Sequence, residues 1–177
     1  MNPSKAIPRI LLWLCFTLAH FSANALTSDR NQSISIQSDR AERDEAKGTT
    51  TYAGNVIMQQ GSMRINAARV VIHNNKSKVT RIIAEGEPAT YQQKPSEAEG
   101  LVVAEAKRLE YDVSNETLHL VERAKLQQEG TQLSGNRIDY DVKSSVVKAG
   151  GNAEQNERVH MVIPARALQE PSANESE

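Results

Sequence analysis

The sequence predicts an all-β protein built from repeated units of antiparallel strands. Three observations support this prediction: a short pattern centred on an arginine recurs along the chain, apolar residues alternate with polar ones, and short polar segments separate the alternating runs. Alternation with a period of two is typical of strands with one buried face, and recurrence at a fixed interval is typical of repeated structural units. No segment carries a convincing apolar stripe of helical spacing over three turns.

Residues 1–25 have the features of a secretory signal. Lys5 and Arg9 precede an apolar run over 10–19, and Ala23-Asn-Ala25 fits a cleavage site made of small residues. Because the apolar run is shorter than the roughly 20 residues that a helix needs to span a bilayer, cleavage is favoured over retention as a membrane anchor.

The chain after the leader is predicted to have two parts. Residues 26–166 form the folded domain, and residues 167–177 form a polar, acidic tail that we expect to be disordered. The leader would take with it the chain's only cysteine and tryptophan and both phenylalanines. The exported domain would then depend on hydrogen bonds and apolar burial rather than on a disulfide.

The charge of the chain restricts its partners. The full sequence has a net charge of −1, and the leader removes two further positive charges. A generic polyanion binder attracts its partner through an excess of positive charge. We therefore expect no nucleic-acid partner.

The recurring pattern is centred on four arginines. It forms a double unit that repeats after 68 residues, from Arg40 to Arg108 and from Arg69 to Arg137. The last three copies continue with apolar residues one and three places after the arginine. For Arg69 and Arg137, a repeated role at strand ends or turns is favoured over ligand binding.

Alternating apolar runs of four to eight residues extend from Ile34 to Ile163. Hairpin-sized polar connections separate them, at 47–48, 61–62, 74–76, 114–116, 129–130 and 143–145. The loop at 95–100 leads into a further strand. We expect about a dozen or more short strands, with two rows of apolar side chains turned toward a common interior.

Candidate residues for catalysis or metal binding are few. His73, His119 and His160 lie far apart in unrelated contexts, and no phosphate-binding loop, dinucleotide fingerprint or nucleophile elbow is present. Asp139 and Asp141 flank Tyr140, where a solvated outer face is favoured over paired-carboxylate catalysis. We expect no catalytic residues, metal or cofactor, and no enzymatic activity.

The apolar face constrains the fold further. A sheet with one apolar face and no helix to cover it must close on itself as a barrel, a sandwich or a jelly roll. Its interior is either packed with its own side chains or holds an apolar ligand. The absence of Phe and Trp after the leader leans slightly toward the second alternative, because aliphatic side chains leave a smoother channel.

Several motifs resemble the organic-solvent-tolerance (OstA-like) domain family. They are Tyr52-Ala-Gly-Asn-Val56, the segment 60–67 and Arg69-Val-Val-Ile72, with further matches at 86–91, 109–111 and 162–164. The resemblance covers residues 34–164, and within the family it points to periplasmic lipopolysaccharide transport. It implies a twisted, partly open antiparallel β-jelly roll whose two sheets form a V and hold the acyl chains of lipid A.

The resemblance also implies partners. Units join head to tail, the N-terminal edge meets an LptC-like inner-membrane protein, and the C-terminal edge meets an LptD-like outer-membrane protein, so that a bridge crosses the periplasm. The edge residues that we expect to dock are Ser33, Ile34, Ser35 and Ile36 at one end, and Val159, Met161 and Ile163 at the other.

Alternation combined with the resemblance predicts which residues face the lipid groove. They are Ile34, Ile36, Met58, Ile65, Val70, Ile72, Tyr91, Leu109, Tyr111, Leu126, Ile138 and Tyr140. Plain core packing is the alternative for those near the closed side of the groove. Two other classes of protein stay open: a membrane-tethered, LptC-like relative that keeps its N-terminal helix, and a structural β-repeat protein with a dry core.

Overall fold

The computed structural model describes residues 29–76, 78–96, 98–151 and 157–165. The predicted leader and the predicted tail lie outside these residues, so their boundaries stay predictions. The described residues form a short 3-10 turn, Asp29–Asn31, and ten strands: β1 (Ser35–Gln37), β2 (Arg40–Asp44), β3 (Thr49–Gln60), β4 (Met63–Asn75), β5 (Lys78–Gln93), β6 (Val102–Asp112), β7 (Thr117–Gln128), β8 (Thr131–Asp141), β9 (Val146–Gly150) and β10 (His160–Val162).

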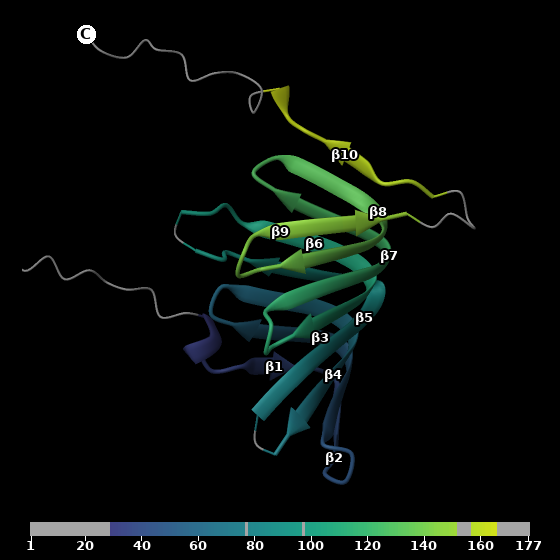
Figure 1. The fold of residues 1–177 in the computed structure, drawn as a ribbon. Coiled ribbons are helices and arrows are strands. Elements are labelled where there is room, and N and C mark those ends of the chain that lie inside the picture. Colours follow the sequence, from purple (N-terminus) through teal and green to yellow (C-terminus); the bar gives the residue numbers. More distant parts are fainter. Residues whose placement is uncertain (1–28, 77, 97, 152–156, 166–177) are drawn as a thin grey trace, which may run out of the picture.

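All strands belong to one antiparallel sheet with the order β1-β3-β4-β5-β6-β7-β8-β10, in which β2 also pairs with β3 and β9 also pairs with β8. Figure 1 shows the strands stacked along the molecule in chain order, with β1 and β2 at one end and β9 and β10 at the other. The two ends do not pair with each other, so the sheet stays open. The predicted all-β, partly open jelly roll is confirmed.

The strands are fewer and longer than predicted. Strands β3 to β8 each contain 11 to 16 residues. In β4, for example, the apolar alternation of 63–67 and that of 70–72 lie on either side of a register shift at Asn66/Arg69 but belong to one strand. The reason is that a β-bulge interrupts the alternation without ending the strand.

These bulges form a continuous row across the sheet. The register shifts at Ala53/Val56, Asn66/Arg69, Glu85/Ala89, Glu105/Arg108 and Val121/Ala124. We call this line the bulge row. It divides the sheet into a first half-sheet, which includes β1 and β10, and a second half-sheet, which includes β2 and β9. Bulges bend strands and increase their twist, so the two half-sheets can turn toward each other.

Gly54 shows how the backbone makes this bend. Its φ is +82°, and an added Cβ would lie 2.2 Å from a carboxylate oxygen of Asp39. Asp39 in turn separates β1 from β2, and its amide donates to the Gly54 carbonyl at 3.0 Å. Strand β7 has Glu122 and Arg123 at its bulge, both with positive φ. Glycine is therefore not required at every bulge.

The two half-sheets enclose one apolar interior, as the sequence predicted. In the first half-sheet the strand register aligns one interior row: Ile36, Met58, Ile65, Tyr91, Ala104, Leu126, Leu133 and Met161. In the second, one row contains Tyr52, Val70, Ala84, Leu109, Leu120, Ile138 and Ala149, and another contains Ile72, Ile82, Tyr111, Leu118, Tyr140 and Val147. The rings of Tyr91 and Tyr111, one from each half-sheet, lie 6.4 Å apart.

Candidate functional site

The twelve residues expected to face a groove all lie in or against this interior. Ten are buried: Met58, Ile65, Val70, Ile72, Tyr91, Leu109, Tyr111, Leu126, Ile138 and Tyr140. Ile34 and Ile36 are half-buried and pack against the same cluster. The structure therefore brings the predicted set together, whereas contact with a ligand stays a prediction.

The prediction missed other interior residues of equal burial, among them Val56, Met63, Ile82, Leu118 and Leu120. Alternation in 117–121 could have identified the two leucines. Ile82 is harder to identify because its neighbour Ile83, on the outer face, is also buried. An apolar pair of this kind hides the period of two.

A cavity of about 300 Å³ lies at the mouth between the half-sheets, away from the bulge row. We call it the mouth cavity. Its walls come from the segment before β1, the end of β3, the start of β5 and the end of β6: Ile34, Gln60, Lys78, Val79, Ile82, Tyr111 and Val113. Most of these side chains are apolar, and Lys78 is the one charged residue among them.

A polar contact crosses the mouth at another point. Ser145, in the turn between β8 and β9, donates a hydrogen bond from its hydroxyl to Glu99, in the loop between β5 and β6. Ser96 donates a second bond to the same carboxylate at 2.8 Å. These bonds, first from Ser145 and then from Ser96, lower the pKa of Glu99. Nearby in sequence, burial raises the pKa of Tyr140, and a hydrogen bond between its hydroxyl and Ser145 opposes this rise.

Asp29 fixes the N-terminal segment across the ends of the first half-sheet. Its carboxylate accepts bonds from the Ser62 amide at 2.8 Å, the Ser62 hydroxyl at 2.6 Å and the Gln93 side-chain amide at 2.8 Å. The Tyr91 hydroxyl donates a hydrogen bond to the side-chain oxygen Oε1 of Gln93, so the hydrogen-bond network extends into the apolar interior. Burial raises the pKa of Tyr91 well above its usual value. The sequence analysis missed Asp29, which belongs to no repeat.

Both predicted docking segments lie at open edges. Strand β1 pairs only with β3, and β10 pairs only with β8, so each has one side without a strand partner among the described residues. Side chains near β10 are unusually exposed for apolar residues: Val159 is 42% exposed, Met161 54% and Ile163 49%. Docking at these edges stays a prediction.

The four repeated arginines occupy one line on the sheet, directly after the bulge row. The register places Arg40, Arg69, Arg108 and Arg137 in this line, with Glu85 between the second and third. Arg69 and Arg108 both donate to Glu85, at 3.2 and 2.6 Å. Arg69, Arg108 and Arg137 therefore lie within long strands rather than at strand ends, and they contact neighbouring strands on the outer face. Arg40 is the first residue of β2.

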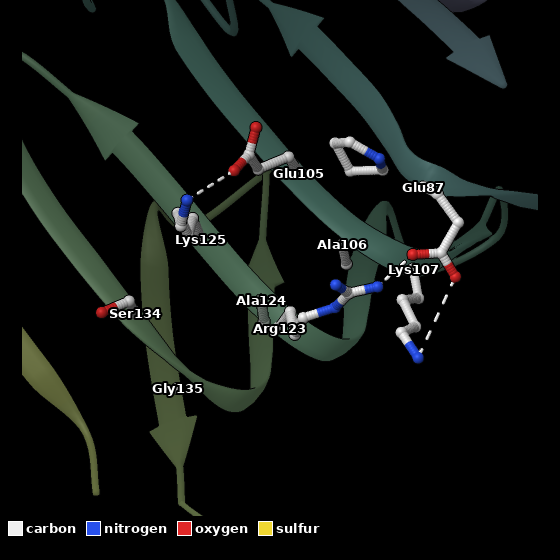
Figure 2. A pocket seen from close by; sticks show the side chains of 10 residues that line it. Glu87, Glu105, Ala106, Lys107, Arg123, Ala124, Lys125, Ser134 and Gly135 are labelled. Carbon is white, nitrogen blue, oxygen red and sulfur yellow. Dashed lines mark hydrogen bonds and ion pairs between the residues drawn. The ribbon is translucent and has the colours of Figure 1, made fainter. Parts of the chain in front are cut away.

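A second cavity, of about 320 Å³, lies along the bulge row, where side chains of β5 to β8 meet. Figure 2 shows its charged lining paired with itself: Lys125 contacts Glu105 at 2.8 Å, and Glu87 contacts both Arg123 and Lys107. The lining holds three cations and two carboxylates, and Lys107 also contacts Glu122 at 3.3 Å, so each cation of the lining has a carboxylate partner.

On the outer face, His119 and Asp139 contact each other and Arg137. His119 contacts Asp139 at 2.5 Å, and Arg137 contacts the same carboxylate at 2.7 Å. Burial alone would raise the pKa of Asp139, but the hydrogen bonds from Arg137 and His119 outweigh it and lower the pKa. Within the described ranges, no three His, Cys, Asp or Glu residues are grouped so that they could hold a metal ion.

None of the helical structure in the described part of the chain has the length and apolar character needed to cross a bilayer.

Comparison with known proteins gives consistent matches. The family model described as LptA/(LptD N-terminal domain) LPS transport protein matches residues 35–146. The lipopolysaccharide export system protein LptA of Haemophilus influenzae is 36% identical over 165 residues, which is 92% of this chain and 94% of the relative. The export system protein LptH of Pseudomonas aeruginosa is 33% identical over 142 residues, which is 80% of this chain and 81% of the relative.

A solved structure is also similar. The crystal structure of Pseudomonas aeruginosa LptH, described as the LptA-homologous periplasmic component of the conserved lipopolysaccharide transport device, matches with a TM-score of 0.72 and 32% identity. The match covers 77% of this chain and 99% of that one.

Proposed function

Because the chain belongs to the LptA/(LptD N-terminal domain) family of LPS transport proteins, we propose that it carries lipopolysaccharide across the periplasm and shields the acyl chains of lipid A between its two half-sheets. The observation that carries this proposal is the continuous apolar interior of a sheet whose ends do not close. At about 0.8 kcal/mol per methylene, exposing one long acyl chain to water costs on the order of 10 kcal/mol. A carrier therefore needs an apolar path along its whole length.

The edges support a bridging role. The first interior row begins at Ile36 on β1 and ends at Met161 on β10, so apolar side chains reach both edges. Stacking one copy on another by strand addition would extend this row from copy to copy and pair the open backbone groups of β1 and β10. In this proposal the N-terminal edge receives an LptC-like inner-membrane protein, and the C-terminal edge meets an LptD-like outer-membrane protein.

The same proposal assigns location and class. The relatives are named as export system proteins, and the similar solved structure is described as a periplasmic component. We infer a periplasmic, non-enzymatic transport protein that works without a cofactor.

The groove can be tested with a pair of photocrosslinking probes. Tyr111 belongs to an interior row and is 5% exposed, whereas its neighbour Glu110 lies on the outer face beside Arg108. After incubation with lipopolysaccharide, a probe at position 111 should form lipid adducts and a probe at 110 should form none. Both proteins are first shown to be folded by circular dichroism.

A dry-core structural protein is the second candidate. The burial of ten predicted groove residues against one another favours it, because packed side chains leave little space for a long acyl chain beyond the mouth cavity in this conformation. Lipid adducts at neither position would support the dry core.

The membrane-tethered alternative depends on residues 1–25, outside the described part of the chain. Determining the N-terminal residue of the exported protein would separate release from tethering. Release predicts that the chain begins at residue 26.

A further inference from the structure

The mouth cavity differs from the rest of the interior in its one charged residue. Lys78 is exposed at the start of β5 and lines the cavity together with Val79, Ile82, Val113 and Ile34. The cavity therefore offers an apolar wall and a cation within one small space. A volume of about 300 Å³ is at the lower end of the range for small-ligand pockets.

Lys78 has no ionic partner in the part of the chain that the structure describes. Other lysines of the sheet do have partners: Lys125 contacts Glu105 at 2.8 Å, and Lys107 contacts Glu122 at 3.3 Å. A cation that is unpaired beside an apolar cavity can pair with an anion whose apolar part occupies that cavity. Ammonium groups form strong, charge-assisted hydrogen bonds with phosphate and carboxylate oxygens.

We propose that the mouth cavity binds the junction between an acyl chain and an anionic head group, with the Lys78 ammonium donating to a phosphate or carboxylate oxygen of that head group. This proposal rests on the proposed function and adds where the charged end of the lipid lies. The methylenes next to the head group lie against Val79, Ile82 and Val113. The rest of the chain continues into the groove past Tyr111, which lines both spaces.

Position in the fold supports this arrangement. Lys78 and Val113 lie at the ends of strands in the second half-sheet, and Ile34 precedes the edge strand of the first half-sheet. The cavity is thus at the opening between the half-sheets, where a hydrated head group can stay in water while its chain is buried. A head group placed at the bulge row would instead meet the closed side of the interior.

The test compares three probes on the full exported protein: dodecyl phosphate below its micellar concentration, the uncharged dodecyl maltoside, and inorganic phosphate. Binding is measured by isothermal titration calorimetry. We expect Lys78→Ala to weaken the binding of dodecyl phosphate about fivefold, which corresponds to about 1 kcal/mol. A solvent-exposed ion pair contributes at most about this much free energy. Dodecyl maltoside should bind the variant as it binds the wild type.

Three further variants complete the comparison. Lys143→Ala removes an exposed lysine from the β8–β9 turn at the same end of the second half-sheet, and it should leave all binding unchanged. Val113→Ala reduces the apolar wall and should weaken both dodecyl ligands together. Lys78→Arg keeps the charge and should retain most of the affinity for dodecyl phosphate.

Each contrary outcome has a definite meaning. Equal losses in Lys78→Ala and Lys143→Ala would indicate general charge attraction and overturn the site. Tight binding of both dodecyl ligands without any effect of Lys78→Ala would also overturn it, while leaving the groove function intact. Tight binding of inorganic phosphate alone would identify a free-anion site and overturn the proposed lipid junction. If the wild type bound none of the dodecyl ligands, the proposed function itself would fail.

Discussion

The two edges of the sheet are built differently. The N-terminal edge is anchored: Asp29 accepts three hydrogen bonds, and Ile34 and Ile36 pack against the interior cluster. The C-terminal edge is loose by comparison, because every residue of β10 is exposed. The Ser134 hydroxyl of β8 donates a hydrogen bond of 3.4 Å to the backbone carbonyl of His160 in β10.

This difference indicates a division of roles. The N-terminal edge shapes the groove mouth as well as offering a strand for pairing, so changes there should affect stability. The C-terminal edge adds little to the interior of its own copy, and its exposed apolar side chains are useful when another protein covers them. Substitutions at the two edges should therefore have opposite profiles, with large effects on folding at one edge and on association at the other.

The largest effect is expected for Asp29→Ala. The substitution leaves the buried Gln93 amide and the Ser62 backbone amide without their acceptor, at a cost of about 2–3 kcal/mol in the free energy of unfolding. The Ser62 hydroxyl can still donate to the Lys94 carbonyl at 3.2 Å. Urea denaturation measures the cost, and hydrogen exchange should show faster opening of β1. Asp44→Ala, at an exposed turn of the same edge, is the matched control and should leave the exchange of β1 unchanged.

Ile36→Ala is expected to have a smaller effect. Ile36 lies opposite Met58 at the start of the first interior row but is only half-buried. For a half-buried Ile, truncation to Ala should lower the free energy of unfolding by about 1–2 kcal/mol, less than the 2–5 kcal/mol that is typical when the Ile is fully buried. A loss below about 0.5 kcal/mol in chemical denaturation would contradict the idea that this edge supports the interior.

Asp139→Asn tests the pH dependence of β8, the strand that carries the C-terminal edge. The pKa of Asp139 is lowered in the folded protein. Its ionised carboxylate therefore stabilises the fold fully above about pH 3.9, the pKa of an unperturbed Asp, and this stabilisation is lost as the pH falls through the lowered pKa of the folded state. At pH 7 we expect the free energy of unfolding of the wild type to exceed that of the variant by less than about 1 kcal/mol. This difference should shrink toward pH 2, and thermal denaturation between pH 7 and pH 2 measures it. A difference that stayed constant over this range would contradict stabilisation by the ionised Asp139 carboxylate.

Met161→Ser should affect stability least. Met161 is 54% exposed, so the free energy of unfolding should change by no more than about 0.5 kcal/mol. Self-association, followed by analytical ultracentrifugation, should weaken clearly. Unchanged association would mean that β10 is not the docking edge.

Alternation combined with the family resemblance predicted an interior set that includes Met58, Ile65, Leu109 and Ile138, and all four are buried. It could not predict the bulge row, since a bulge and a strand end both interrupt the period of two. The arginine repeat was visible, but its role depends on Glu85 lying between Arg69 and Arg108, which follows from strand order. Asp29 and the contact between Glu99 and Ser145 join segments distant in sequence and leave no periodic signal.

The most direct test of the account is photocrosslinking from position 161 in concentrated, purified protein, with position 103 as control. Met161 lies at the exposed C-terminal edge, whereas Val103 is 42% exposed on the outer face of the central strand β6. The account predicts that probes at 161 form adducts between copies that mass spectrometry maps to residues 33–37, and that probes at 103 form few adducts. Adducts that join residue 161 to β10 of a second copy, or equal yields from both positions, would contradict head-to-tail pairing of the two edges.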